Sequence, residues 1–414
     1  MKLSEHRDMA AQSTLQLLDE LAVFGAEESG GVTRLLYTKP WVDAQRFLAE
    51  RMRKAGLEAR FDRAGNLIGR LAGTDSGSGA IVTGSHIDTV VNGGRYDGAY
   101  GVAAGIAAIE YLLEAYGPPK RTLEVISFCE EEGSRFPLTY WGSGHLVGSH
   151  SWDQADAIAD ASGISLREAM EAAGFGDPAQ PDPVRQDIEA FVELHIEQGI
   201  VLERQQLRIG IVDTIVGQKR YIVTLEGESN HTGTTPMGLR RDALAGAAEM
   251  VVAIERLAVQ YGDPLVATVG KITCEPNTPN VIAGRVSFTL DIRLDDGVAL
   301  TQVSERILQE LAAIAERREL VFQAVNWLLT EPAPMSPELT GMLERICQEQ
   351  GVSARRMVSG AGHDAQLLTG VAKTAMIFIP SRGGISHSPD EYSTPEQLSD
   401  GVMLLTDMLY ALAY

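Results

Sequence analysis

The chain has 414 residues, of which 44% are hydrophobic and 22% are charged, so it can bury the cores of two or three domains. Its formal net charge of −21 excludes nucleic acid and anionic membranes as expected partners, because both would be repelled. Three widely spaced cysteines and an N-terminal segment without an apolar stretch indicate a cytoplasmic protein. The most apolar helical segment, 101–113, is too short to span a bilayer.

Helical and strand-like segments alternate over most of the chain. Helical periodicity predicts helices near 5–22, 41–55, 99–115, 237–258, 297–317, 336–350 and 395–413. Short apolar runs predict strands at 80–84, 122–128, 191–194 and 374–379. This alternation is typical of an α/β domain with a mainly parallel sheet flanked by helices, in which the loops at the strand ends carry the functional site.

Residues 213–326 show a different order of elements. A strand KRYIVTLEGE is followed by the helix at 237–258, with Pro236 near its first turn, and then by the strands PLVATVGKITC and GRVSFTLDIRL. The helix at 297–317 and the strand ELVFQAVNW complete a β-α-β-β-α-β unit. We therefore expect an inserted ferredoxin-like domain at 213–326, and a larger domain formed by 1–212 and 327–414.

The segment GSHIDTVVNGGRYDG at 84–98 follows the first of these strands. Residues two apart on an extended segment share a face, so His86 and Asp88 project the same way, and Asp88 could hold the imidazole of a metal ligand. Asp97 lies among glycines at the start of a predicted helix. Taken alone, this segment is explained equally well as a polar loop in which Asp97 is an ordinary helix N-cap.

Three more polar clusters follow apolar strands. Glutamates occupy 130–132 after the strand at 122–128, His195 follows 191–194, and His387 lies in a Gly/Ser/Pro-rich loop after 374–379. Each cluster alone could be a solvated loop or a structural histidine. Their recurrence at strand ends predicts one crevice instead, because the carboxyl ends of parallel strands converge. These histidines and carboxylates suit two divalent ions, Zn²⁺ or Mn²⁺, that share a bridging carboxylate.

Together, the motifs GSHIDTVVNGGRYDG, EEEG, ELHIEQG and GISHSP resemble those of the M20-type binuclear metallo-amidohydrolases. GESNHTGTTPMGLRRDA and SGAGHDAQ extend the resemblance to essentially the whole chain, and to the branch that cleaves N-carbamoyl and ureido groups. The resemblance implies a small ureido acid as substrate. It also implies that the inserted domain is a lid and dimerisation domain.

The same resemblance implies a set of metal ligands: His86, Asp97, Glu132, His195 and His387. Asp97 would bridge the two ions, and His86 and His195 would bind opposite ions. Glu132 is chosen over its neighbours because the ligand of the family motif precedes a glycine, here Gly133. Glu131 would be the general base, and Asp88 would hold the ring of His86.

The substrate residues are also implied by the resemblance. His231 would stabilise the oxyanion, acting on the site of the other chain in a homodimer. Arg293 would bind the substrate carboxylate, and Gln218 and Asn280 would supply neutral hydrogen bonds. The backbone at Ala361 and Gly362 would add donors. Alternatively, His231 merely ends a strand and Arg293 is a solvated side chain at a strand end.

Two other kinds of protein would keep this fold. One is a metallo-exopeptidase, which the EEEGSRF motif and the whole-chain resemblance disfavour. The other is a catalytically inactive binding protein. Such a protein is expected to lack a ligand or the base, whereas every expected position is filled here.

Overall fold

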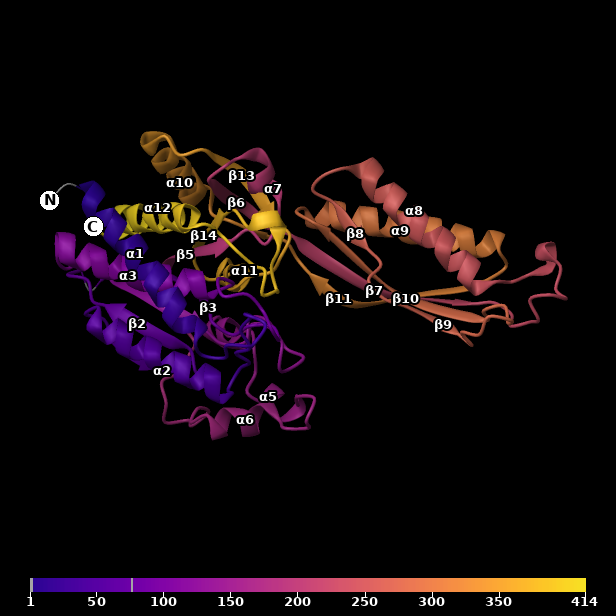
Figure 1. Ribbon diagram of the computed structural model, residues 1–414, viewed down its shortest axis with the longest axis horizontal. Coiled ribbons are helices and arrows are strands. Elements are labelled where there is room, and N and C mark those ends of the chain that lie inside the picture. The colour runs from indigo at the N-terminus through magenta and orange to yellow at the C-terminus, as the bar shows by residue number, and fades with distance from the viewer. Residues whose placement is uncertain (1–2, 76) are drawn as a thin grey trace. The chain divides into compact units, whose positions relative to one another are not determined.

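A computed structural model describes residues 3–75 and 77–414 (Figure 1). The chain forms two compact units, one of Met1–Asp213 with Pro334–Tyr414 and one of Thr214–Ala333. The second unit extends beyond the expected residue 326, because its last strand, β11 (Val321–Thr330), is longer than the segment ELVFQAVNW. Each unit has its own apolar core.

The first unit is built on a nine-stranded sheet. Its order is β1 (Glu58–Phe61), β2 (Leu67–Leu71), β4 (Leu123–Phe128), β3 (Ala80–His86), β5 (Ile188–Ile196), β14 (Lys373–Ile379), β6 (Ile209–Ile215) and β12 (Ala333–Pro334), and β13 (Ala354–Ser359) pairs with β6. The four central strands β4, β3, β5 and β14 are parallel, whereas β2 and β6 join them in antiparallel orientation. The prediction of a mainly parallel sheet is therefore confirmed.

Helices cover this sheet. They are α1 (Leu3–Ala22), α2 (Lys39–Lys54), α3 (Ala99–Tyr116), α4 (Trp141–Leu146), α5 (Gln154–Ala157), α6 (Leu166–Ala172), α7 (Val201–Gln205), α10 (Pro337–Gln350), α11 (Asp364–Leu368) and α12 (Pro395–Ala413), with a 3-10 turn η2 (Arg382–Gly384). Every residue of β3 and of β4 is buried, as expected for central strands covered on both faces. Helices α1, α3 and α12 pack on one another.

The second unit is an antiparallel sheet with two long helices. Its strands run in the order β11, β7 (Gly217–Glu226), β10 (Arg285–Leu294) and β8 (Val266–Thr268), and β9 (Ile272–Glu275) pairs with another part of β10. Strands β8 and β9 replace the single strand expected over PLVATVGKITC. Helices α8 (Ala243–Tyr261) and α9 (Gly297–Arg317) pack on the sheet, and they lie on the same side of it in Figure 1.

Helix α8 begins later than the periodicity predicts. The carboxylate of Asp242 accepts hydrogen bonds from the backbone N–H groups of Leu244 and Ala245, and this cap places the first helical residue at Ala243. Pro236 is therefore not in the first turn of α8, but precedes a separate 3-10 turn, η1 (Met237–Leu239).

Within the described part of the chain, no helix is both long enough and apolar enough to cross a membrane.

Candidate active site

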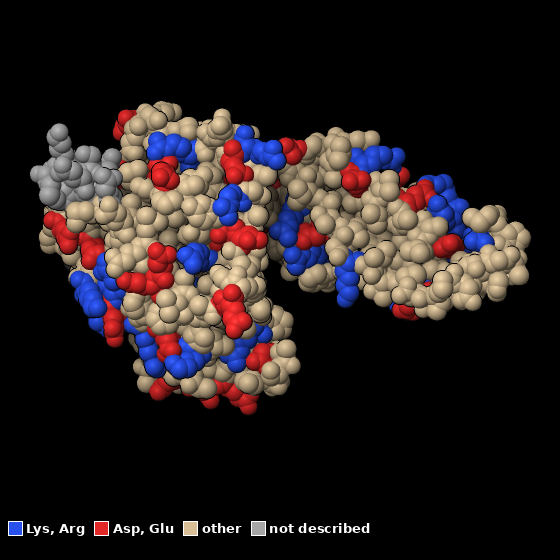
Figure 2. Space-filling view, in the orientation of Figure 1, with Lys and Arg blue, Asp and Glu red and all other residues tan. Residues whose placement is uncertain are grey.

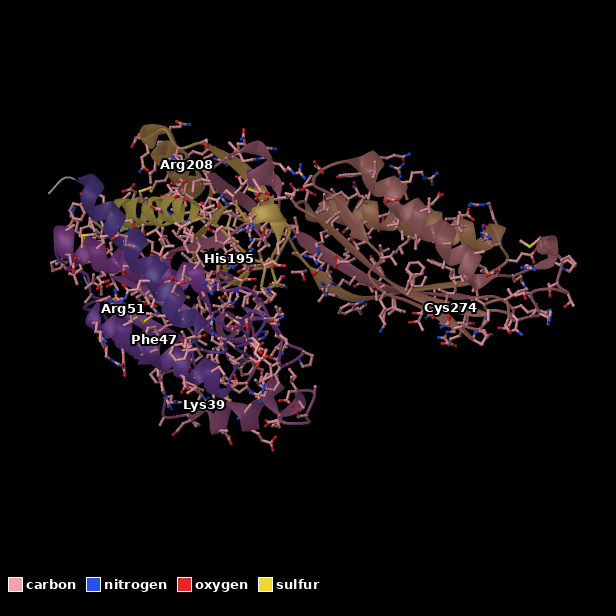
Figure 3. All side chains as sticks on the ribbon, in the orientation of Figure 1. Lys39, Phe47, Arg51, His195, Arg208 and Cys274 are labelled. Atoms are coloured by element: carbon pink, nitrogen blue, oxygen red, sulfur yellow. The ribbon has the colours of Figure 1, made fainter. Side chains whose placement is uncertain are left out.

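The five predicted metal ligands gather in the first unit, where the central parallel strands end. His86 is the last residue of β3, and His195 lies near the end of β5 (Figure 3). Glu132 follows β4, His387 follows β14, and Asp97 precedes α3. Parallel topology brings these strand ends together at one edge of the sheet.

Asp97 is the centre of this cluster. Its Oδ1 lies 3.1 Å from Nε2 of His195 and 3.6 Å from Nε2 of His86. Its Oδ2 lies 3.2 Å from Nε2 of His387, which is 3.3 Å from Oε1 of Glu132. The donor atoms form two groups, His86–Asp97–His195 and Asp97–Glu132–His387, each within 4.8 Å. One carboxylate is therefore common to both groups.

His86 and His195 fall in the same donor group, whereas the resemblance implies that they bind opposite ions. Both rings approach the same oxygen of Asp97, and their centroids are 6.0 Å apart in a stacked arrangement. The physical reason is that β3 and β5 are neighbouring parallel strands, so their ends present both histidines to the same side of Asp97. His387, from the loop after β14, approaches the other carboxylate oxygen of Asp97, Oδ2.

The Nδ1 atoms of His86 and His195 are held by backbone carbonyls. Nδ1 of His86 lies 3.0 Å from the carbonyl oxygen of Asp88, and Nδ1 of His195 lies 2.9 Å from that of Ile196. The carboxylate of Asp88 was expected to hold His86, but its nearest oxygen is 3.9 Å away, while its Oδ2 accepts a hydrogen bond from the backbone N–H of Glu132. Asp88 thus positions His86 with its backbone and Glu132 with its side chain. Each histidine turns Nε2 toward Asp97.

The electrostatics of the cluster favour bound cations. Burial, opposed by His86 and reinforced by the charge of Glu132, raises the pKa of Glu131 well above its usual range. Burial and the charge of Asp97 raise the pKa of Glu132 to about 7. Burial favours a raised pKa for Asp97 as well, but hydrogen bonds from three histidines outweigh burial and hold this pKa well below the usual range. The three are His195, His387 and His86. Such crowding of buried carboxylates is relieved by positive charge.

The three consecutive glutamates have different surroundings. Glu130 has a positive φ of 51°, and its Oε1 accepts hydrogen bonds from the backbone N–H groups of Arg135 and Phe136, so it shapes the loop. Glu132 belongs to the second ligand group. Glu131 belongs to neither group, and its Oε2 lies 3.8 Å from Nε2 of His86.

Sequence reasoning missed two residues that hold the ligands. Nε2 of Gln198 donates to Oδ2 of Asp97 at 2.8 Å. Glu391 is buried and accepts hydrogen bonds from the backbone N–H groups of Tyr96 and Asp97 and from the hydroxyl of Ser386. Gln198 lies inside the motif ELHIEQG and Glu391 lies two residues after GISHSP, but nothing in the sequence shows that these side chains reach Asp97.

The surroundings of Gly98 explain why the first motif has glycine at this position. Its φ is +62°, and a Cβ on it would lie 2.5 Å from the ring of His86. Any larger residue would therefore displace the ring of His86. The N-terminus of α3 receives no side-chain cap, so Asp97 is not an ordinary N-cap.

Ala361 and Gly362 lie in the loop before α11, in the first unit. The hydroxyl of Ser359 donates to the carbonyl of Ala361 at 2.8 Å. The next residue, His363, has its ring centroid 4.5 Å from that of His195, which places this loop beside the ligand cluster.

The remaining predicted substrate residues belong to the second unit. Gln218 and Arg293 are directly opposite each other on β7 and β10. His231 is exposed and forms an isolated bridge with Val281, next to Asn280, whose carbonyl accepts a hydrogen bond from Thr232. Nδ1 of His231 accepts a hydrogen bond from the backbone N–H of Gly233 at 3.0 Å, which leaves Nε2 as the ring's other polar atom.

The chain and its fold match those of a known family of hydrolases. Residues 82–411 match Peptidase family M20/M25/M40, and the chain belongs to this family. A solved structure described as an amidase of the hydantoinase/carbamoylase family from Burkholderia multivorans superposes with a TM-score of 0.93 at 34% identity, covering 97% of this chain and 98% of that one.

Curated relatives make the similarity more specific. The chain is 50% identical to allantoate amidohydrolase of Bacillus subtilis (strain 168), covering 97% of this chain and 98% of the relative. It is 47% identical to allantoate amidohydrolase of Escherichia coli (strain K12), with the same coverage. Identity to N-carbamoyl-L-amino acid amidohydrolase of Geobacillus stearothermophilus is 39%, covering 96% of this chain and 97% of the relative.

Proposed function

We propose that this chain is a metal-dependent amidohydrolase that converts allantoate and water to ureidoglycine, ammonia and CO₂, in the catabolism of ureide nitrogen. The observation that carries the proposal is the identity of 50% and 47% to two allantoate amidohydrolases over nearly the full length, against 39% to an N-carbamoyl-L-amino acid amidohydrolase. We place the reaction in the cytoplasm, where the three free cysteines would stay reduced.

The residues around Asp97 fit two divalent ions, Zn²⁺ or Mn²⁺. Imidazole nitrogens and carboxylate oxygens suit both metals, and the two donor groups share one carboxylate. One ion would be held by His86, Asp97 and His195, and the other by Asp97, Glu132 and His387. When bound, such ions polarise a carbonyl oxygen and make water a better nucleophile near neutral pH.

Glu131 is the general base of this proposal. It lies beside the cluster but outside both donor groups, so its carboxylate is available for proton transfer. It takes a proton from water as the water oxygen bonds to the ureido carbon, and it gives the proton to the nitrogen that leaves as ammonia. The remaining carbamate releases CO₂. Proton transfer of this kind contributes roughly 10²–10⁴-fold to the rate.

Four side chains and two backbone positions would bind the substrate. His231 would donate to the oxyanion that develops on the ureido carbon, and Arg293 would bind the carboxylate. Gln218 and Asn280 would hydrogen-bond the neutral ureido groups, with backbone donors at Ala361 and Gly362. The exposure of His231 and the position of Gln218 opposite Arg293 support these roles.

We further propose that the second unit is a lid and dimerisation domain, and that His231 acts on the partner chain. Helix α8 exposes Val252 and Val259, with exposed fractions of 63% and 75%, which a second copy could cover. A His231→Ala chain should be inactive, as should a Glu131→Gln chain. Their mixture should regain activity, because one site in each heterodimer then has both residues intact. A mixture that exchanges subunits but stays inactive would exclude action in trans.

A substrate panel tests the function itself. Ammonia release would be measured with allantoate, N-carbamoyl-L-amino acids, N-carbamoyl-β-alanine and ureidoglycolate, with Mn²⁺ or Zn²⁺ added. We expect the highest kcat/KM for allantoate. Preference for an N-carbamoyl compound would identify an N-carbamoyl-L-amino acid hydrolase or a β-ureidopropionase instead. Cleavage of a dipeptide without ammonia release from any ureido compound would reject the proposal.

A further inference from the structure

A second aspartate gathers positive charge in the second unit. On β10, Leu290 and Ile292 are buried in the core, so Asp291 and Arg293 project from the opposite face of the sheet. The antiparallel register places Arg220 of β7 opposite Asp291, and Gln218 opposite Arg293. Figure 2 shows basic side chains gathered around acidic ones at the end of this unit where β7 and β11 lie.

The carboxylate of Asp291 accepts hydrogen bonds from all three neighbours. Nε2 of Gln218 lies 3.0 Å from its Oδ1 and 2.8 Å from its Oδ2. Nε of Arg220 donates to Oδ2 at 3.0 Å. Arg293 donates from Nε to Oδ1 at 3.2 Å and from Nη2 to Oδ2 at 3.1 Å. Both arginines therefore turn their Nε–H toward one carboxylate.

Arg220 is also held from its other neighbouring strand. Asn326 and Leu328 of β11 pair with Tyr221 and Arg220, and the β-bulge between them leaves Trp327 as the extra residue. The guanidinium carbon of Arg220 lies 5.5 Å from the centroid of the Trp327 ring, within the range of a cation–π contact. The side chain of Arg220 is thus fixed between Asp291 and an aromatic ring.

We propose that Asp291 is a positioning residue that holds Arg220 and Arg293 as one receptor for the substrate carboxylate, with Arg220 as its second cationic contact, and that it keeps Gln218 beside them. This inference rests on the proposed function, because it assumes a ureido acid as substrate. Two guanidinium groups side by side would repel each other, and the single charge of Asp291 offsets this repulsion. Two positive charges and one negative charge leave one net positive charge, which matches one substrate carboxylate.

The chemistry of the groups supports this receptor. A guanidinium has five N–H donors in a planar fork, so contacts through one edge are compatible with binding a carboxylate through another. Burial raises the pKa of Asp291, but hydrogen bonds from Arg293 and Gln218 outweigh burial and hold this pKa below its usual value. Asp291 is therefore ionised at neutral pH and can hold both arginines.

The test compares a charged substrate with a neutral one. In Asp291→Asn the side chain keeps its size but loses its charge. We expect KM for allantoate to rise about tenfold, the loss expected for one charge-assisted hydrogen bond, with little change in kcat. KM for the carboxamide of allantoate should not change, because that molecule has no carboxylate. Arg220→Met should show the same pattern.

Glu226→Gln is the matched control, because Glu226 is exposed on the same face of β7 and its substitution also removes one negative charge. Its KM values should equal those of the wild type. Asp291→Asn with equal losses for both substrates, or with unchanged KM for allantoate, would overturn the inference. Wild-type activity on allantoate reports separately on the proposed function. If the wild type prefers another ureido acid, KM is compared for that acid and its carboxamide. A wild type that is inactive on every ureido acid overturns both the proposed function and this inference.

Discussion

The clusters around Asp97 and Asp291 are each centred on one aspartate, but they are built in different ways. Asp97 is buried, and its partners come from the ends of β3 and β5 and from the loops after β4 and β14. Asp291 is half-buried, and its partners lie on the same two paired strands, β7 and β10, within two residues of Asp291 or of the residue opposite it. Histidines and carboxylates surround the first, whereas arginines and an amide surround the second.

This difference indicates two tasks. A buried set of nitrogen and oxygen donors from separate segments fixes cations in one geometry, because each segment is anchored by the fold. A half-exposed set of cationic donors on a sheet face can bind and release a small anion. Changes at the first cluster should therefore affect metal content and kcat, and changes at the second should affect KM.

The largest effect is expected from Asp97→Ala. Because Asp97 belongs to both donor groups, its loss should remove both ions and all measurable activity. Metal content measured by mass spectrometry checks this. Asp390→Asn, an exposed aspartate in the loop of His387, is the control and should keep both ions. A variant at Asp97 that retains two ions would show that this carboxylate is not shared.

Glu131→Gln should separate catalysis from metal binding. Because Glu131 lies outside both donor groups, the variant should keep its metal while kcat falls by roughly 10²–10⁴-fold or more, as for loss of a general base. Glu132→Gln should instead lose metal. The opposite result, with metal lost from the variant at Glu131 and kept in the variant at Glu132, would mean that the two roles are exchanged.

Arg293→Ala should affect the second cluster alone. Loss of the charged partner of a substrate carboxylate costs on the order of 2–5 kcal/mol in binding, so KM for allantoate should rise steeply. Metal content should stay at the wild-type level, because Arg293 and the ligands belong to different units. Steady-state kinetics and metal analysis of the same preparation check both statements. An unchanged KM would remove Arg293 from the receptor.

Much of the first cluster was predictable from the sequence. His86, Glu132, His195 and His387 each follow an apolar strand, and parallel topology brings such strand ends together. The grouping of His86 with His195 was not predictable in the same way, because it depends on which strands are neighbours. Asp88 contacts the ring of His86 with its backbone carbonyl and not with the expected carboxylate, and the sequence does not distinguish these two contacts.

The second cluster shows the limit of sequence motifs. Gln218 and Arg293 were singled out one at a time, but Asp291 and Arg220 were not. Their contact depends on the register of β7 and β10, and a shift by one residue would turn Asp291 into the core. Gln198 and Glu391 were missed for a related reason, because their contacts with Asp97 join segments far apart in the chain.

The smallest expected effect is a change in stability with pH that comes from a buried histidine outside both clusters. His145 of α4 lies between Trp141 and Trp152, with ring centroids at 4.2 and 3.9 Å, and among the described residues its Nε2 has no hydrogen-bond partner. Burial, together with the charges of His150 and Arg63, lowers its pKa to about 4 from the ordinary histidine value of 6.5. Between these two pH values the unfolded chain binds a proton that the folded chain does not.

Protonation of His145 should therefore destabilise the fold as pH falls from 6.5 toward 4, and should have no effect above that range. One such group changes the free energy of unfolding by at most about 1.4 kcal/mol per pH unit. His145→Phe keeps an aromatic ring between the two tryptophans but cannot titrate. Urea unfolding of both proteins, with EDTA present so that metal release does not contribute, should show a steeper loss of stability for the wild type between pH 6.5 and pH 4. Parallel curves would show that burial between the two indole rings does not make His145 resist protonation in the folded state.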